Sequence, residues 1–395
     1  MAKGGKKTRN QTDQGEMESS KKKTSKVKTK SKHELAKVTS IPKAVARTLG
    51  IMFSVGSVCS GLCTEVFALQ SLLGDNFGVV DHTFACDSSP VAKEFARANF
   101  KHLFKKGHYY DDLTSKEFLQ NAPEVDLFTA GFPCQPFSLQ GLNRGEADAR
   151  GQVIWYILRY LKRALPRAVM LENVPGLKAR HPETLLAILK AIKGIKDAEG
   201  QPYQVCWTIL DSLVHGALPQ SRKRLYICAW RGGGKWPGWP SDIPARSLKS
   251  IMENLPANPM GRDRVLPTGR GSREAVLKML KEIIAAGVNP AKADIAIDCD
   301  SSVPRYVIWH TPCLTASRGA GHGYWITRAG RKMTVPELFR LQGFDPSAIN
   351  IAGGSDRQIG HMIGNAFSQT IVERVLARLL RAAALGPKKL KDRWA

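Results

Sequence analysis

Stretches typical of strands alternate with stretches typical of helices between about residues 51 and 230, and this alternation constrains the fold more than any other feature. Repeated strand–helix units indicate an α/β fold with a mostly parallel, doubly wound sheet. Ligands of such sheets bind beyond the carboxyl ends of the strands. The predicted strands lie at 51–58, 81–86, 125–130, 168–171 and 225–230, and the predicted helices at 65–73, 90–99, 153–164 and 182–195.

The alternation breaks off at about residue 231. Residues 232–240 are rich in Gly, Pro and Trp, which excludes a regular helix or strand there. One helix is predicted at 273–286, and regular patterns return at 334–341 and 371–384. The predicted divisions are a disordered Lys-rich tail at 1–48, the main α/β domain at 49–230, an inserted lobe at 231–325, a segment returning to the main domain at 326–386 and a basic tail at 387–395.

Positive charge is concentrated at the N-terminus. The formal net charge is +25, and residues 1–50 hold 14 Lys and Arg against 4 Asp and Glu, which places +10 there and leaves +15 for the rest. Such a segment is too polar to fold and suits a nucleic-acid backbone or a nuclear-import receptor. The alternative is a solubilising tail with no fixed partner. We therefore expect a polyanionic partner and a nuclear location.

Apolar patterning and cysteine content indicate a soluble intracellular protein. No apolar run approaches the roughly 20 residues that cross a bilayer, and the N-terminus lacks the apolar core of a secretory signal. The eight cysteines are therefore expected to be reduced. Cys59 and Cys63 form one close pair, but no second Cys or His pair stands at zinc-ligand spacing. We expect no metal site and no membrane contact.

Cys134 follows the predicted strand at 125–130, in the segment 131–138, which reads Gly-Phe-Pro-Cys-Gln-Pro-Phe-Ser. Flanking prolines hold this thiol rigid where a base can approach. Carbon 5 of cytosine is a poor nucleophile, but addition of a thiolate at carbon 6 gives an enamine-like ring that accepts a methyl group. Taken alone, a Pro-Cys pair is more often a buried loop cysteine, so the interpretation depends on its companions.

Two further segments carry groups that assist this addition. One ends the predicted strand at 168–171, and the other precedes the predicted strand at 225–230. Glu172, in the segment 171–176, is suited to donate a proton to N3 of the ring, for which burial should raise its pKa. The segment 220–224, Gln-Ser-Arg-Lys-Arg, offers guanidinium groups for O2 of the base and the adjacent phosphate. The alternatives are an exposed or helix-capping carboxylate and a solvated basic turn.

The order of these motifs resembles that of the cytosine-C5 DNA methyltransferase family over roughly residues 51–230 and 310–385. The resemblance implies the S-adenosylmethionine-dependent methyltransferase fold, a target-recognition lobe at 231–325 and extrusion of the target base from a duplex. The segment 334–344 resembles the one that organises the recognition lobe, and a polar stretch at 141–151 is expected to close over a bound base.

Roles for individual residues follow from the same resemblance. Cys134 is implied as the nucleophile and Glu172 as the partner of N3, while Arg224 contacts the flipped cytosine and Arg222 supports the nucleophile loop. The positions implied to bind substrate are Pro133 and Gln220.

S-adenosylmethionine is the cofactor that the resemblance implies. The family's first loop is an aromatic residue followed by Gly-x-Gly-Gly, whereas residues 59–64 read Cys-Ser-Gly-Leu-Cys-Thr and keep one of the three glycines. Asp87 matches the acid that takes the ribose hydroxyls, and Asp112 matches the residue beside the adenine amino group; the alternatives are a helix-capping and a turn aspartate. The implied cofactor-binding residues are Cys59, Ser60, Gly61, Asp87, Asp112, Pro133 and Asn365.

Four functions remain to be weighed. The leading one is a DNA cytosine-C5 methyltransferase, since the inserted lobe is long enough to read DNA. A tRNA cytosine-C5 methyltransferase shares the catalytic motifs and is the closest alternative. A catalytically weak nucleic-acid-binding scaffold is favoured only by the altered first loop. A Cys–His hydrolase is the least favoured function, because the pattern places no histidine of this sequence at a strand end near Cys134.

Overall fold

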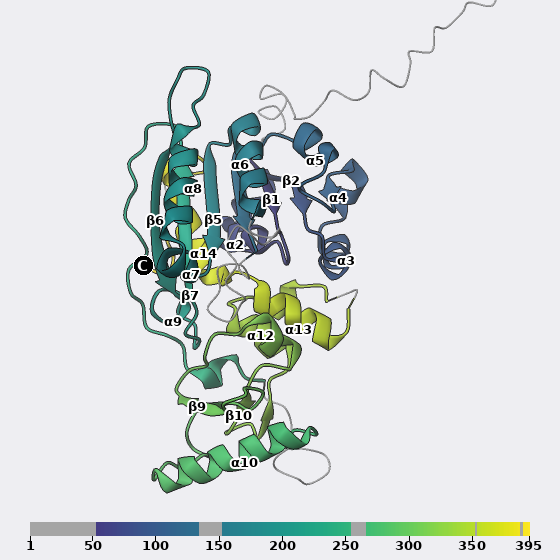
Figure 1. The fold of residues 1–395 in the computed structure, drawn as a ribbon, viewed down its shortest axis with the longest axis vertical. Helices are drawn as coiled ribbons and strands as arrows, with labels where there is room; N and C mark the ends of the chain where they lie inside the picture. The colour runs from purple at the N-terminus through teal and green to yellow at the C-terminus, as the bar shows by residue number, and fades with distance from the viewer. Residues whose placement is uncertain (1–52, 134–151, 254–265, 352–353, 388–389) are drawn as a thin grey trace, which may run out of the picture. The chain divides into compact units, whose positions relative to one another are not determined.

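The computed structural model describes residues 53–133, 152–253, 266–351, 354–387 and 390–395 (Figure 1). All of the described residues belong to one compact unit. Cys134, the stretch at 141–151 and the Lys-rich segment at 1–48 lie outside the described residues.

A seven-stranded sheet in the order β3-β2-β1-β4-β5-β7-β6 forms the centre of the main domain (Figure 1). Strands β1 to β5 pair in parallel, whereas β7 pairs antiparallel with both β5 and β6. This confirms the predicted mostly parallel α/β sheet. The strands are β1 (Phe53–Val58), β2 (Val80–Cys86), β3 (Tyr109–Tyr110), β4 (Leu127–Gly131), β5 (Ala168–Asn173), β6 (Gln204–Asp211) and β7 (Lys223–Trp230).

Helices cover both faces of this sheet. On one face α6 and α8 pack their apolar residues on β4, β5 and β7, and on the other α2 and α14 pack on β1, β5 and β7. The helices of the main domain are α2 (Thr64–Leu73), α3 (Pro90–Asn99), α4 (Lys101–Lys106), α5 (Lys116–Asn121), α6 (Val153–Ala164), α7 (Gly176–Arg180), α8 (Pro182–Gly194), α9 (Ser212–His215), α12 (Val335–Leu341), α13 (Asp356–Asn365) and α14 (Gln369–Ala382), with 3-10 turns at Gly74–Val79, Leu248–Ile251 and Pro346–Ala348.

The last helix returns the chain to its first strand. Val375 and Leu379 of α14 belong to the same buried cluster as Phe53 and Val55 of β1. Residues 390–395, predicted as part of a basic tail, pack against this helix. Leu390 is buried, and Asp392 pairs with the fully buried Arg374 at 2.8 Å. The described end of the chain is therefore part of the main domain and not a free tail.

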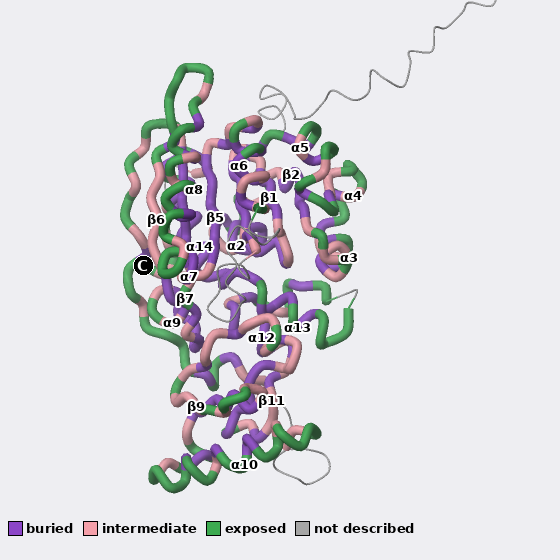
Figure 2. The backbone as a smooth tube through the Cα atoms, in the orientation of Figure 1, coloured by how far each residue is buried: buried purple, intermediate pink, exposed green. Residues whose placement is uncertain are grey.

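A second, smaller sheet in the order β11-β10-β8-β9 forms the inserted lobe, with α10 packed on it. Trp325 is fully buried in this lobe, so the boundary predicted at residue 325 falls inside a strand. Figure 2 shows α10 with many exposed residues on the outer side. The elements are α10 (Arg270–Ala285), β8 (Ile295–Asp298), β9 (Arg305–Ile308), α11 (Ala316–Ala320), β10 (Trp325–Ile326) and β11 (Arg331–Lys332).

The start of the predicted lobe belongs to the main domain. Trp236 stacks in a tilted arrangement with Trp230 of β7, their ring centroids 5.4 Å apart. A Cβ on Gly234 would lie 2.3 Å from the carbonyl oxygen of Ala382, so this segment touches the end of α14 directly. Within the described residues, no helix is long and apolar enough to cross a membrane.

Glycines bring α11 and α13 into backbone contact. A Cβ on Gly319 would lie 1.9 Å from the carbonyl oxygen of Gly360, and one on Gly364 would lie 2.3 Å from that of Thr315. Any side chain at these positions would force the helices apart. The close packing fixes α13, and with it Asn365, next to the carboxyl ends of the sheet strands.

Candidate active site

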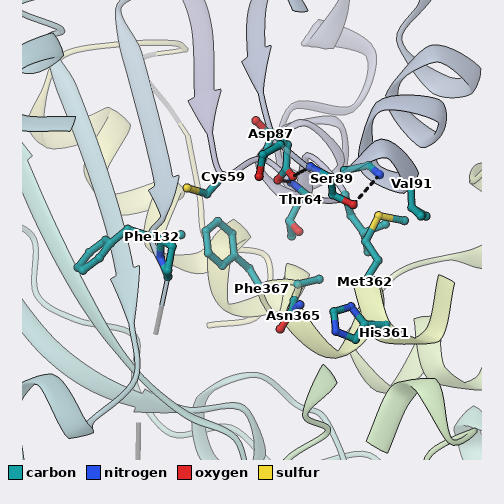
Figure 3. Close-up of a pocket in the computed structure, with 18 of the residues that line it drawn as sticks. Cys59, Thr64, Asp87, Ser89, Val91, Phe132, His361, Met362, Asn365 and Phe367 are labelled. Carbon is teal, nitrogen blue, oxygen red and sulfur yellow. Dashed lines mark hydrogen bonds between the residues drawn. The ribbon is translucent and has the colours of Figure 1, made fainter. Parts of the chain in front are cut away.

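A cavity of about 560 Å³ opens at the carboxyl ends of β1, β2, β4 and β5, where ligands of parallel sheets bind. Figure 3 shows residues from the ends of β1 and β2, such as Cys59 and Asp87, facing Phe367, Asn365 and His361. Ten of the predicted site residues line this cavity. They are Cys59, Ser60, Gly61, Asp87, Asp112, Pro133, Glu172, Arg222, Arg224 and Asn365.

The loop between β1 and α2 forms the floor of the cofactor side. Cys59, Gly61 and Cys63 all have left-handed backbone conformations, with φ close to 50°, and only one of them is a glycine. Ser60 ties the loop to β2, because its hydroxyl donates to the carbonyl of Cys86 at 3.1 Å and accepts from the amide of Cys86 at 3.0 Å. The sharp turn is therefore kept although two of the family's three glycines are missing.

Asp87 follows β2 and is held by two backbone amides. Its carboxylate accepts from the N–H of Gly61 at 2.8 Å and from that of Ser89 at 2.9 Å. Burial raises the pKa of Asp87, and these two hydrogen bonds oppose the rise. A carboxylate oxygen has more than one lone pair, so Asp87 retains capacity to accept from a diol.

Asp112 lies in a turn at the rim. Its side chain accepts from the amide and hydroxyl of Thr114, both at 2.8 Å, and the residue is exposed. The turn geometry matches the alternative foreseen for this residue, but the turn also lines the cavity. Asn365 ends α13 on the opposite side and is also exposed.

This side of the cavity fits S-adenosylmethionine. Its size lies within the usual range of cofactor sites, about 300–1,000 Å³. A Cβ built on Gly61 would meet no atom within 4 Å, so the backbone there borders open space that a ligand can approach. The carboxylates of Asp87 and Asp112 also suit a ligand that carries a positive sulfonium and an ammonium group.

An acid and a guanidinium group form the other side. Glu172, near the end of β5, is buried, and its Oε1 lies 3.2 Å from Nε of Arg224 in β7. Burial raises the pKa of Glu172, although Arg224 and Arg222 pull it down. Glu172 pairs in register with Gly131, the last residue of β4, three residues before Cys134. The predicted acid thus lies beside the strand that leads to the predicted nucleophile.

Arg222 is a buried connector. Its guanidinium group donates to the carbonyls of Leu314 at 2.6 Å, Gly364 at 3.2 Å and Ala366 at 2.7 Å. These bonds join the residue before β7 to Leu314 and to the C-terminal end of α13. The predicted support of the nucleophile loop cannot be compared with this geometry, because that loop lies outside the described residues.

Gln220 does not line the cavity, contrary to its predicted contact with substrate. Its side chain is fully buried, donates to the carbonyl of Leu341 at 3.0 Å and accepts from the amide of Leu314 at 2.7 Å. Both ends of the amide are thus used within the protein. Gln220 joins the segment before β7 to α12 and has no exposed group for a substrate.

Cys313 is a site neighbour that the sequence did not single out. Its Sγ lies 3.5 Å from Nη1 of Arg222 and 3.6 Å from Nη2 of Arg224. Burial alone would raise the pKa of this thiol, but the two guanidinium groups outweigh burial and lower it. The sequence pattern did not point to Cys313, because this residue is distant in sequence from both arginines.

Phe367 also lines the cavity, and it closes the segment 363–367 that resembles the family's C-terminal motif and contains Asn365. A Cβ on Gly131 would lie 2.5 Å from its ring, so the ring packs directly over the end of β4. Figure 3 shows this ring between Cys59 and Asn365. The cavity therefore contains an aromatic ring, although residue 59 is a cysteine. This ring belongs to Phe367, in the short connection between α13 and α14.

Comparison with known proteins identifies the family and the fold of this chain. The model of the C-5 cytosine-specific DNA methylase family matches residues 73–381, which is more than half of the chain. The chain belongs to this family. The resemblance seen in the motif order is confirmed, and with it the enzyme class of the family.

Individual relatives agree with the assignment. The type II methyltransferase M.HaeII of Haemophilus aegyptius is 30% identical over 281 residues, covering 68% of this chain and 78% of the relative. M.NgoBI of Neisseria gonorrhoeae is 30% identical over 265 residues, covering 64% and 73%. The crystal structure of S. pombe Dnmt2 methyltransferase shares the fold, with a TM-score of 0.56, 20% identity and coverage of 83% of this chain and 98% of that one.

Proposed function

We propose that this C-5 cytosine-specific methylase transfers a methyl group to carbon 5 of a flipped-out cytosine in DNA, with Cys134 as a covalent nucleophile. The observation that carries the proposal is the buried Glu172. It is paired with Arg224 and lies in register with the strand that leads to Cys134. The relatives M.HaeII and M.NgoBI are named as type II methyltransferases, which supports DNA as the substrate.

The first step forms a bond between the Cys134 sulfur and carbon 6 of the base. The electron pair of the C5–C6 double bond moves toward N3, where Glu172 donates a proton or a short hydrogen bond. Because burial raises the pKa of Glu172, its protonated form persists to higher pH than that of an exposed glutamate. Arg224 balances the carboxylate that remains after proton donation.

Bound S-adenosylmethionine supplies an electrophilic methyl group to carbon 5. Asp87 and the Gly61 backbone would hold its ribose side, and Asn365 would lie on the opposite wall. After methylation, the proton on carbon 5 leaves to water and the C6–S bond breaks, which returns the thiolate to Cys134. N3 gives its proton back to Glu172, which restores the aromatic ring and the starting state of the acid.

Methyl transfer to defined substrates tests the proposal. The full chain is incubated with labelled S-adenosylmethionine and either duplex DNA or total tRNA, for the wild type and for Cys134→Ser. We expect label in DNA that disappears in the variant. Label only in tRNA would replace DNA by RNA as substrate, and label in neither would favour the scaffold function.

A mechanism-based trap tests the covalent step separately. DNA carrying 5-fluorocytosine lacks the C5 proton that must leave, so the enzyme should remain attached through Cys134. Methyl transfer to ordinary DNA without any trapped adduct would contradict the covalent mechanism.

The Lys-rich segment gives two further proposals, nucleic-acid binding and nuclear import. The relatives M.HaeII and M.NgoBI come from bacteria, so nuclear import is supported by the charge pattern alone. Expression of the full chain and of a chain lacking residues 1–48 as fluorescent fusions in a eukaryotic cell tests it. Equal distribution of the two would remove this proposal.

A further inference from the structure

Three side chains with metal-binding atoms meet inside the protein near the start of α2. Cys63 precedes the helix, Glu65 lies in its first turn, and His82 belongs to β2. All three are buried, and one ligand atom from each lies within 4.8 Å of those from the other two. None of them lines the candidate active site. The cluster is therefore a separate feature of the molecule.

Three polar atoms of this cluster have no hydrogen-bond partner, although the Glu65 carboxylate as a whole also interacts with Ser57. Oε1 of Glu65 and both ring nitrogens of His82 are buried and accept or donate no hydrogen bond. Glu65 and His82 are only 1% and 5% exposed, so bulk water does not reach these atoms. Leaving such an atom unpaired costs about 1–3 kcal/mol. A bound ion would satisfy one atom of each residue at once.

Neighbouring polar groups are engaged elsewhere. Nε2 of His102 bonds the backbone carbonyl of His82 at 3.0 Å and not its ring. The carboxylate of Asp81 is used by the hydroxyl of Thr83 at 2.9 Å and by Lys106 at 3.0 Å. Besides the cluster, the ring of His82 makes edge contacts with the rings of Phe100 and His102.

Cys63 carries its side chain in an unfavourable backbone conformation. Its φ is 50°, in the left-handed region where glycine has no penalty and other residues pay roughly 1–2 kcal/mol. Glycine would relieve this strain. A thiol thus occupies a position that the backbone conformation favours for glycine, which fits a use for its sulfur.

We propose that Cys63, Glu65 and His82 bind one divalent transition-metal ion of the Zn²⁺ type, with water as the fourth ligand. Sulfur, carboxylate oxygen and imidazole nitrogen are the ligands that Zn²⁺ prefers. One thiolate and one carboxylate neutralise the two positive charges of the ion, so the buried complex is uncharged. The thiol proton, and that of Glu65 where it is protonated, leave to solvent on binding.

Without an ion, burial keeps the Cys63 thiol protonated, so the ion must displace this proton to bind. Burial raises the pKa of the Cys63 thiol and raises that of Glu65 to about 7, and it lowers the pKa of His82 to about 3. His82 is therefore neutral at pH 7, which is the form that binds a metal. His82 also lines a second cavity of about 390 Å³, which gives water an approach to the site.

The ion would join β2 to the loop at 59–63 that borders the cofactor cavity. Its expected role is structural, since none of the three ligands lines the candidate active site. Binding should raise the thermal stability of the chain and strengthen cofactor binding by fixing the loop.

Metal binding by the full chain is the first test. Chelator-treated protein is titrated with Zn²⁺ in competition with a chromogenic chelator, and separately with Co²⁺. We expect one Zn²⁺ per chain, an increase in Tm, and a thiolate-to-cobalt charge-transfer band in the near ultraviolet. Absence of saturable Zn²⁺ binding by the folded wild type would overturn the proposal.

Substitutions assign the ion to these ligands. Cys63→Gly removes the sulfur and also relieves the left-handed strain, so it should fold, and Glu65→Gln removes the charge at nearly constant size. Each should weaken binding by more than about 100-fold, because losing a second-shell partner alone costs about 10–100-fold. The cobalt band should vanish in Cys63→Gly.

Cys228→Ser is the matched control, since Cys228 is a fully buried strand cysteine outside the cluster. It should keep the affinity and the cobalt band. A band that persists in Cys63→Gly would place the ion at another thiol, and unchanged affinity in Glu65→Gln would exclude the carboxylate; either result overturns the site as proposed.

Discussion

The two sides of the candidate active site are held in different ways. On the cofactor side, Asp87 is fixed by the backbone amides of Gly61 and Ser89, so its position depends on the left-handed turn at 59–63. On the catalytic side, Glu172, Arg224 and Cys313 are fixed by one another through side-chain charge. Changes to the first side should therefore affect cofactor binding, and changes to the second should affect turnover.

The largest effect is expected from Glu172→Gln. The variant keeps the size of the side chain but cannot donate a proton to N3, so kcat should fall by about 10²–10⁴-fold with little change in cofactor Kd. Because the pKa of Glu172 is raised, wild-type activity should decline on the alkaline side as this acid ionises, and the variant should lack that decline. Steady-state kinetics across pH measure both.

Glu183→Gln controls for the loss of a carboxylate, since the side chain of Glu183 is 71% exposed and distant from the lining of the cavity. Its kinetics should match the wild type. A Glu172→Gln enzyme that loses cofactor affinity and keeps kcat would reverse the distinction between the two sides.

Asp87→Asn should have the next largest effect. It removes the charge that accepts from two amides and would accept from the ribose hydroxyls, and hydrogen bonds to charged groups are worth about 1.5–3 kcal/mol. We expect S-adenosylmethionine to bind about 10–100-fold more weakly by calorimetry. The exposed Asp75, which is not part of the cavity lining, gives the matched variant Asp75→Asn, and equal losses in the two would contradict a specific role.

Gly61→Ala probes the backbone on the cofactor side. At φ +49° an alanine costs roughly 1–2 kcal/mol, although a Cβ there meets no atom within 4 Å. Thermal unfolding should show the loss. Gly271→Ala in α10, also free of contacts but without a positive φ, should be stabilising by about 0.5–1 kcal/mol. Stabilisation by both changes would refute the claimed strain.

The smallest effect is expected from Cys313→Ala. Loss of the sulfur acceptor leaves Arg224 less firmly placed beside Glu172, and a net hydrogen bond is worth about 0.5–1.5 kcal/mol. We expect kcat to fall about 2–10-fold, with partial rescue by Cys313→Ser, which keeps an acceptor. Cys206→Ala, in β6 and away from the cavity lining, should leave kcat unchanged; a loss of cofactor affinity in place of kcat would refute the positioning role.

Prediction from sequence was most successful where local pattern and packing coincide. Helices α3 and α6 begin and end at the predicted residues, because a capping serine with a proline and a strongly amphipathic run define them locally. Strand β6 was not predicted, and it completes the antiparallel edge through pairing with β7. Its residues are mostly half-buried, which gives a weaker apolar signal.

The sequence by itself determined the family, the α/β fold and the order of Cys134, Glu172 and Arg224, because these motifs lie at strand ends and keep their chain order. Only the tertiary structure decided that Gln220 is a buried connector, that Cys313 touches both arginines, and that Cys63, Glu65 and His82 meet. These contacts join residues from different elements, and spacing along the chain carries no information about which side chains face one another across a core.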